Sequence, residues 1–367
     1  MNEKIREIYS AMAEMISSGK MDAAIPLPKE IDLAEKFKTT RMNAHRAIKE
    51  LEKNGFVSRK KHVGTFISKN FDSQDLRKAI KKANRNVYVM CSTKPNWIHW
   101  NELSYSALEQ KLLKKNYTVT YKNIPQTNSR ESYIEILTEI SRKQASALII
   151  FPDMSDASFL SMNKDLLLDL EIPILMLNRS GEALAFDMVS FVSLDPFGDG
   201  VYVGELLRKN KRKTVLMLNE GSGTAFWGVK RYEGVELGLR HGNTEEFLLR
   251  NIPVNDNEFE NFVNEIKKSP SKSTVIAVNN YYAAKLIDTA KNAGLSTPED
   301  FELISFDDNP AYRAYNITSM SAPMKEIGEL FARFVCEDSW INAYRGKISI
   351  KLPGELVIRE TFKPELI

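Results

Sequence analysis

Aromatic, amide, guanidinium and carboxylate side chains follow several predicted β-strands over the last three quarters of the chain. An aromatic ring can stack on the apolar C–H face of a sugar, and planar polar groups can make paired hydrogen bonds to neighbouring hydroxyls. These residue types at strand ends predict a site for a small polar molecule. The candidate residues of this site are Trp97, Trp100, Asn178, Arg179, Arg231, Asn280, Asp307 and Asp308.

Each of these residues also has a purely structural interpretation. Tryptophans can pack at the start of a helix, asparagine is common in turns, and aspartate often caps helices. Arg231 can pair with Glu233 or Glu236 on the surface of one helix, a contact that is worth little when exposed. The shared position at strand ends favours the binding interpretation for the group as a whole.

The N-terminal part of the chain has a different chemical character, which suits contact with a polyanion. Residues 1–85 carry 19 Lys and Arg against 11 Asp and Glu, a net charge of +8. The remaining 282 residues carry 32 against 37, a net charge of −5. A basic head on an acidic body indicates that only the head meets a polyanion, although charge alone also fits a solvated basic surface.

Helical and strand patterns indicate how the head positions these charges. Apolar residues at helical spacing predict a first helix that ends near Gly19, a short second helix with Ile31, Ala34 and Phe37 on one face, and a third helix with Gly55 at its left-handed exit. Residues 56–58 and 65–67 predict two strands joined by a basic turn. Three helices followed by a basic hairpin make a winged helix-turn-helix.

The face of the third helix opposite its apolar stripe carries polar and cationic side chains. The major groove of B-DNA admits an α-helix whose N-terminal residues reach base edges, and wing cations can neutralise phosphates. A charged helical domain without a nucleic-acid partner has the same spacing, but helix order, basic turn and terminal glycine together favour DNA. The candidate DNA-binding residues are Thr40, Arg41, Met42, His45, Arg46, Lys49, Arg59, Lys60, Lys61, His62 and Gly64.

Several motifs of the head resemble the GntR-family DNA-binding domain. They are residues 27–37 (LPKEIDLAEKF), 40–41 (TR), 47–57 (AIKELEKNGFV) and 64–66 (GTF). The resemblance implies a winged helix that binds double-stranded operator DNA. Ile31 departs from the family, which usually has a DNA-contacting arginine there, and His45 replaces a further arginine common in the recognition helix. The family's usual operator sequence is therefore not carried over.

The rest of the chain predicts a linker and a larger body. Residues 71–85 are polar and basic, which predicts an exposed linker that can include a short helix. From residue 86 onwards about eight strands alternate with helices, a pattern typical of parallel sheets covered by helices on both faces. The predicted fold is multidomain: a winged helix-turn-helix (α+β) over 1–70, then a two-lobed α/β body with parallel doubly wound sheets over 86–367.

The body resembles the periplasmic-binding-protein-like effector domain of LacI-type regulators. The matching segments are residues 172–179 (IPILMLNR), 231–234 (RYEG), 277–280 (AVNN), 298–308 (PEDFELISFDD) and 356–360 (LVIRE). In that family a sugar or nucleobase usually binds between two lobes, and the angle between the lobes governs a dimeric DNA-binding head. The resemblance therefore implies an effector site in the body.

The resemblance also implies roles for the candidate residues. Arg179 and Arg231 are expected to donate to hydroxyls or to the ring oxygen of a sugar. Asn280 stands where the family has a hydroxyl-binding aspartate, and Asn178 also replaces an acid, so the ligand needs donors as well as acceptors. One of the two consecutive aspartates supplies the remaining acceptor, and the two tryptophans stack on the apolar face of the sugar.

A GntR-type head on a LacI-type body resembles the arabinose-responsive AraR-like regulators. We expect a homodimeric, cytoplasmic transcriptional regulator whose effector is a neutral monosaccharide. Two alternatives stay open: a DNA-tethered enzyme that transforms a sugar or nucleotide, and a regulator that senses a purine or a sugar phosphate. The chain shows no P-loop, GxSxG or HExxH motif, so neither catalytic residues nor a cofactor are expected.

Composition excludes several further classes of protein. Two cysteines cannot form a disulfide framework, and four separated histidines show no zinc spacing, so no metal site is expected. No apolar stretch approaches the roughly 20 residues of a membrane span, and Met1–Lys4 do not open a signal peptide, so no membrane partner is expected.

Overall fold

The computed structural model describes residues 3–69, 72–92, 95–124, 129–152, 156–179, 186–220, 226–242, 246–255, 258–269, 271–337 and 348–365. The chain divides into two compact units. One unit comprises Met1–Cys91, Leu112–Ile150 and Ser158–Ile174, and the other comprises Ser92–Lys111, Phe151–Ala157 and Leu175–Ile367.

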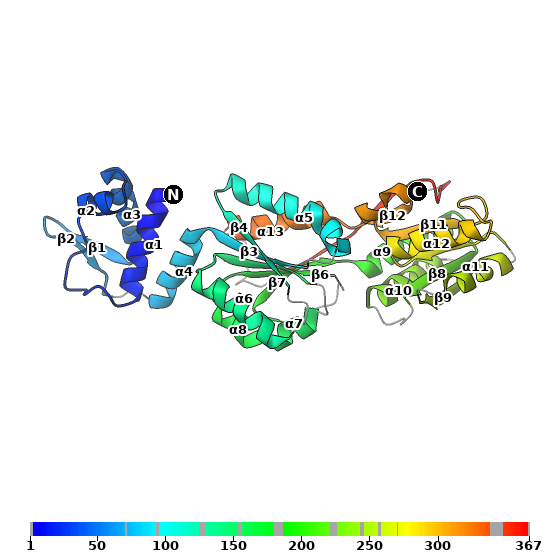
Figure 1. Ribbon diagram of the computed structural model, residues 1–367, viewed down its shortest axis with the longest axis horizontal. Helices are drawn as coiled ribbons and strands as arrows, with labels where there is room; N and C mark the ends of the chain where they lie inside the picture. Colours follow the sequence, from blue (N-terminus) through cyan, green and yellow to red (C-terminus); the bar gives the residue numbers. More distant parts are fainter. Residues whose placement is uncertain are drawn as a thin grey trace. The chain divides into compact units, whose positions relative to one another are not determined.

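The head is a winged helix-turn-helix, as predicted. Its elements are α1 (Glu3–Ser17), α2 (Glu30–Lys36), α3 (Arg41–Lys53), β1 (Val57–Lys60), β2 (Gly64–Ile67) and α4 (Ser73–Asn84) (Figure 1). Thr40 caps α3, because its side chain accepts a hydrogen bond from the Asn43 amide at 3.3 Å. The buried stripe of α3 consists of Ala44, Ala47, Ile48 and Leu51. Its opposite face is thereby left to solvent.

The segment predicted as an exposed linker, 71–85, is instead largely the helix α4. Leu76, Ile80 and Ala83 recur at i, i+4 and i+7, and all three are buried in the hydrophobic core of the head. Asp72 caps this helix by accepting from the Gln74 amide at 2.8 Å. The polar composition of the segment concealed a narrow apolar stripe that completes the head.

The first body sheet is formed by β3 (Asn86–Cys91), β4 (Thr118–Asn123), β5 (Ala147–Phe151), β6 (Ile174–Asn178), β7 (Val189–Leu194) and β13 (Ser349–Leu352). Its strand order is β13-β7-β6-β5-β3-β4. The accompanying helices are α5 (Pro95–Lys114), α6 (Arg130–Arg142), α7 (Asp156–Met162), α8 (Lys164–Asp169) and α13 (Met324–Cys336).

The second body sheet is formed by β8 (Thr214–Glu220), β9 (Leu248–Val254), β10 (Thr274–Ala277), β11 (Glu302–Asp307), β12 (Thr318–Ser321) and β14 (Glu355–Val357). Its strand order is β14-β12-β11-β10-β8-β9, and β14 pairs with β12 in the antiparallel direction. The accompanying helices are α9 (Pro196–Lys209), α10 (Phe226–Arg240), α11 (Phe259–Lys268), α12 (Asn280–Asn292) and the 3₁₀ helix η1 (Pro310–Tyr315).

Helices cover both faces of the second sheet, as the strand–helix alternation predicted (Figure 1). Successive residues of β8 point to opposite faces: Leu216 packs with α11 and α12, whereas Met217 packs with α9 and α10. In the first sheet β3 lies between β4 and β5, and in the second sheet β8 lies between β9 and β10. Each arrangement makes a topological switch point. Ligands of such sheets bind outside the carboxyl ends of the strands near that point.

Glycines hold α9 and α10 in close backbone contact. Gly200 and Gly204 of α9 face Gly234 and Gly238 of α10. A Cβ atom added to Gly234 would overlap the carbonyl oxygen of Phe197. Only glycine permits this separation of the two helices, and the contact holds the C-terminal half of α10 against α9.

All eight strands predicted in the body occur within two residues of their expected ends. The strands that the sequence did not predict are β9, β12, β13 and β14. Three of them are edge strands with partly exposed residues, and β12 has the short polar sequence TSMS. Neither type contains the apolar run that signals a buried strand.

Candidate DNA-binding face and effector site

The third helix of the head presents a continuous exposed stripe. Met42, Arg46 and Lys49 lie at i, i+4 and i+7 of α3, and all three are exposed. Arg41 precedes them in the first turn with 76% of its side chain exposed. The predicted recognition residues therefore share one face, and the exposed side chains of Arg41, Arg46 and Lys49 can reach phosphates.

A carboxylate organises the cations around this face. Glu30, the first residue of α2, lies 2.8 Å from His45 Nδ1, 3.2 Å from an Arg59 guanidinium nitrogen and 3.7 Å from Arg41 Nε. Because a carboxylate only accepts, His45 donates its Nδ1–H to Glu30. Arg59 also contacts the carboxylate of Glu52 at 3.2 Å.

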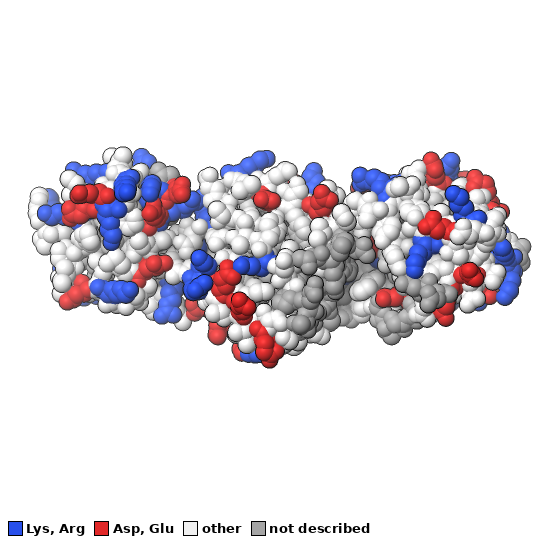
Figure 2. All heavy atoms as spheres, viewed as in Figure 1, with Lys and Arg blue, Asp and Glu red and all other residues white. Residues whose placement is uncertain are grey.

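These contacts affect one of the predicted DNA-binding residues. Arg59 is held by two acids, so its charge is partly neutralised within the head. Sequence patterns did not single out Glu30, because it is an acid in a basic domain. Figure 2 shows such acidic side chains among the Lys and Arg side chains of the head.

The wing carries the other predicted cations. Lys61 and His62 are exposed in the turn between β1 and β2, and Lys60 Nζ lies 4.6 Å from the centre of the Phe66 ring. Gly64 has φ +148°, and an added Cβ would lie 2.9 Å from Pro26 Cβ. Gly64 is thus required for the shape of the wing itself.

The predicted effector residues all belong to the second compact unit, and several are in contact there. Trp100 is buried, and its indole Nε1–H donates to the carbonyl oxygen of Asp307 at 3.3 Å. The Arg179 guanidinium lies 5.3 Å from the Trp100 ring centre, with its Nε atom buried. Trp100 therefore contacts both the Arg179 guanidinium and the loop that follows β11.

Arg231 binds the same loop, which follows β11. Its guanidinium donates to the Val278 carbonyl oxygen at 2.6 Å and to Asp307 Oδ1 at 2.5 Å, and it lies 4.6 Å from the centre of the Phe306 ring. The residue is 5% exposed. The alternative pairing with Glu233 or Glu236 is therefore wrong, because Arg231 points into the lobe.

The two consecutive aspartates point to different partners. Asp307 and Asp308 both have positive φ, +81° and +47°, so the backbone turns sharply after β11. The carboxylate of Asp308 is held by both terminal nitrogens of Arg359, at 2.7 and 2.9 Å. Arg359 also donates to the Ile317 carbonyl oxygen at 2.6 Å. Asp308 is therefore occupied in anchoring this loop, and Asp307 is the better candidate acceptor.

The predicted amides are buried at strand and helix ends. Asn178 ends β6 and is 1% exposed. Asn280 begins α12, and its Oδ1 accepts from the Asn309 amide at 2.8 Å. Asn280 thus also supports the loop after β11. Trp97 lies in the first turn of α5, but its side chain is outside the described residues.

The sequence interpretation missed one titratable residue beside this cluster. Burial raises the pKa of Asp199 in α9 to about 6, and the nearby charges of Asp195 and Asp307 act in the same direction. A hydrogen bond from the Gly354 amide at 2.7 Å and the positive charge of Arg231 lower it. In sequence, Asp199 looks like an ordinary acid in the first turn of a helix. Only its burial in the structure shows that its pKa is raised.

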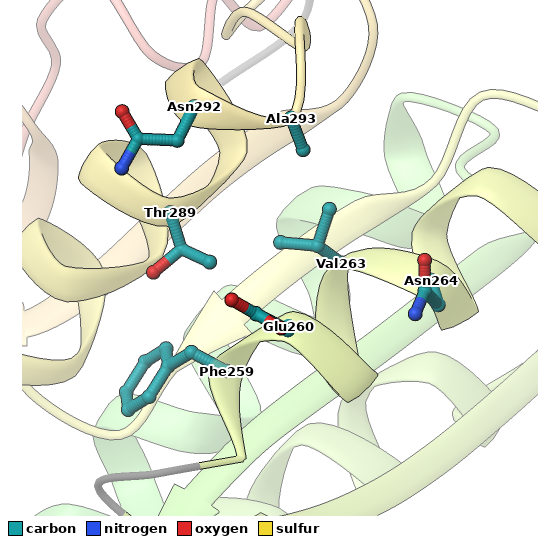
Figure 3. Close-up of a pocket in the computed structure, with 7 residues that line it drawn as sticks. All are labelled: Phe259, Glu260, Val263, Asn264, Thr289, Asn292 and Ala293. Carbon is teal, nitrogen blue, oxygen red and sulfur yellow. The ribbon is translucent and has the colours of Figure 1, made fainter.

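A separate cavity of about 440 Å³ lies between α11 and α12 (Figure 3). Phe259 and Val263 provide its apolar wall, and Glu260, Thr289 and Asn292 add polar atoms. None of the predicted effector residues lines this cavity. Within the described residues, no cluster of His, Cys, Asp and Glu suits a metal ion, and no helix is long and apolar enough to cross a membrane.

Comparison with known families identifies both parts of the chain. The family of bacterial regulatory proteins named gntR matches residues 4–67. The head is a gntR-family DNA-binding domain. The periplasmic binding protein-like domain matches residues 203–362, within the body. Both resemblances inferred from sequence, and the predicted fold class, are confirmed. A gntR-family head with this body makes the chain a DNA-binding transcriptional regulator with an effector domain.

Two curated relatives match most of the chain, and a solved structure matches about three quarters of it. The chain is 23% identical to an arabinose metabolism transcriptional repressor of Geobacillus stearothermophilus, over 89% of this chain and 88% of that protein. It is also 23% identical to the protein of the same name from Halalkalibacterium halodurans, over 96% of each chain. A LacI family transcriptional regulator from Enterococcus faecium with bound ribose has a TM-score of 0.57 at 20% identity, covering 76% of this chain and 99% of that one.

Proposed function

We propose that this gntR-family regulator is a repressor whose operator binding is controlled by a neutral monosaccharide. The two relatives that match most of its length are named as arabinose repressors, and a structural neighbour holds ribose. We further propose that it acts as a homodimer in the cytoplasm and has no enzymatic activity.

The observation that carries the proposal is the connected cluster at the strand ends of the second unit. Arg179 contacts Trp100, Trp100 holds the loop at Asp307, and the carboxylate of Asp307 holds Arg231. A ring face, two guanidinium groups and a carboxylate are thereby placed among buried amides. Such a set offers donors and an acceptor beside an aromatic ring, the kinds of group that bind a monosaccharide.

The contacts suggest a division of roles within this cluster. Arg179 and Asn178 are proposed as direct donors to ligand hydroxyls, and Asp307 as an acceptor. Arg231 is proposed to position Asp307, since its own nitrogens already bind Asp307 and the Val278 carbonyl oxygen. The proposal for direct ligand contact is weaker for the other three candidates. Asn280 and Asp308 already support the loop after β11, and the role of Trp97 is inferred from sequence alone.

For the head, we propose that α3 enters the major groove and that the wing contacts the DNA backbone. Arg41, Arg46 and Lys49 are exposed along α3, and Lys60 and Lys61 occupy the wing. A ligand can change operator affinity only if it binds the two conformations of the regulator unequally. Closure of the body around a sugar is the proposed source of that difference.

A thermal-shift screen of the whole chain against pentoses, hexoses, purines and sugar phosphates tests the effector. A sugar at 100 times its dissociation constant stabilises the body by about 2.7 kcal/mol. Arg179→Ala should weaken binding of the responding sugar at least tenfold. Arg313→Ala, which removes an exposed arginine of η1, should leave it unchanged and serves as the matched control.

The same sugar should release the protein from operator DNA in a gel-shift assay. A response to a purine or a phosphorylated sugar alone would refute the monosaccharide assignment. Conversion of the sugar to a product would show an enzyme instead. Sedimentation of the free protein as a monomer would refute the proposed dimer.

A further inference from the structure

Two large aliphatic side chains remain exposed at the start of the DNA-facing helices. Ile31, the second residue of α2, is 63% exposed, and Met42, the second residue of α3, is 58% exposed. The head buries its other helical apolar stripes almost completely. Two large apolar residues exposed beside a cationic surface suit a partner that offers both apolar and anionic groups.

The two residues lie next to the same cluster of charges. Glu30 directly precedes Ile31, Arg41 directly precedes Met42, and the Glu30 carboxylate reaches both Arg41 and His45. The first turns of α2 and α3 therefore adjoin.

The cations place the apolar pair with respect to DNA. Met42, Arg46 and Lys49 form one exposed stripe, with the apolar residue at the N-terminal end of α3. The N-terminal end of a recognition helix is the part that reaches base edges, whereas flanking cations contact phosphates. Docked in this way, α3 would place Met42 at the level of the bases, and the adjoining first turn of α2 would bring Ile31 close to them.

The chemistry of the bases selects one of them. In the major groove, adenine, guanine and cytosine present hydrogen-bonding atoms, and thymine presents its 5-methyl group as well. Isoleucine and methionine side chains offer no N–H or O–H donor to base edges, but they pack favourably on a methyl group. We propose that Ile31 and Met42 read thymine 5-methyl groups in the operator. This inference rests on the DNA-binding role of the head.

Deoxyuridine provides a direct test, because it removes only the methyl group and keeps base pairing. The full chain is first used to select operators from randomised duplexes. Each selected thymine is then replaced singly by deoxyuridine, and binding is measured by fluorescence anisotropy. Loss of one buried methyl contact should weaken binding about fourfold at one or more thymines in each half-site.

Variants connect the effect to the two side chains. Ile31→Ala and Met42→Ala should each abolish the deoxyuridine penalty at one position, because the contact has already been lost. Both side chains are more than half exposed, so the variants should fold, as circular dichroism can verify. Ile25→Ala is the matched control: Ile25 is 60% exposed in the loop before α2, outside α3 and the wing, and its loss should leave every penalty unchanged.

A further variant reverses the preference. Ile31→Arg introduces a side chain that binds guanine bidentately, so selection with this variant should exchange thymine for guanine at one position. Tight binding of selected operators with equal affinity for thymine and deoxyuridine at every position would overturn the inference and leave the DNA-binding function intact. Failure to select any duplex would overturn both.

Discussion

Asp199 offers the most quantitative test of the structure. Its carboxyl group is buried in α9, and burial raises its pKa from the ordinary 3.8 to about 6. Folding therefore favours the protonated form of this side chain. Asp199→Asn replaces it with a neutral group of the same shape, whose Oδ1 can still accept from the Gly354 amide.

The sign and size of the effect follow from linkage. Well below pH 3.8 the carboxyl is protonated in both folded and unfolded chains, so its burial carries no charge cost. As the pH rises through 6 the folded state must hold the charged form, so the contribution of Asp199 to stability is lost. A pKa raised from 3.8 to about 6 corresponds to about 3 kcal/mol. Asp199→Asn should thus come within about 1 kcal/mol of the wild type at pH 4 and exceed it by up to about 3 kcal/mol at pH 7.5.

Urea unfolding followed by tryptophan fluorescence provides the assay, because all four tryptophans lie in the body, at positions 97, 100, 227 and 340. The exposed acid Glu299, in the same unit as Asp199, supplies the control: Glu299→Gln should change stability by less than about 0.5 kcal/mol at both pH values. If Asp199→Asn gave no gain at pH 7.5, or the same gain at pH 4, the argument from burial would be wrong.

Three further outcomes are expected. Gly234→Ala should destabilise the body by about 3 kcal/mol in the same unfolding assay, because its Cβ overlaps the Phe197 carbonyl oxygen and forces α9 and α10 apart. An unchanged midpoint would show that the helices can separate freely. Arg359→Ala should cost about 2–3 kcal/mol by leaving the Asp308 carboxylate without its bidentate partner; Asp308→Asn in the Arg359→Ala background should then recover part of the loss. Operator affinity should fall as salt rises, and Arg46→Ala should reduce the slope of log affinity against log salt by about 1. A salt-independent affinity would contradict the phosphate contacts.

Local patterns were sufficient to predict the architecture. The apolar stripe of α3 and the basic hairpin predicted the winged helix, and buried apolar runs predicted eight body strands. These signals are read from neighbouring residues, and the structure follows them. Edge strands such as β9 and the narrow stripe of α4 were not recognised, because their periodicity is weak or lies within a polar segment.

By itself, the sequence determined that a basic gntR-family head precedes an α/β body, and which residue types stand at the strand ends. It did not determine which of those residues act together. Arg231 binds Asp307, 76 residues away, instead of Glu233 on its own helix, and Asp308 binds Arg359, 51 residues away. Such choices depend on burial and on which chain segments the fold brings together, and neither is encoded in local spacing. The tertiary structure decided them because a buried charge must find a partner, wherever along the chain that partner lies.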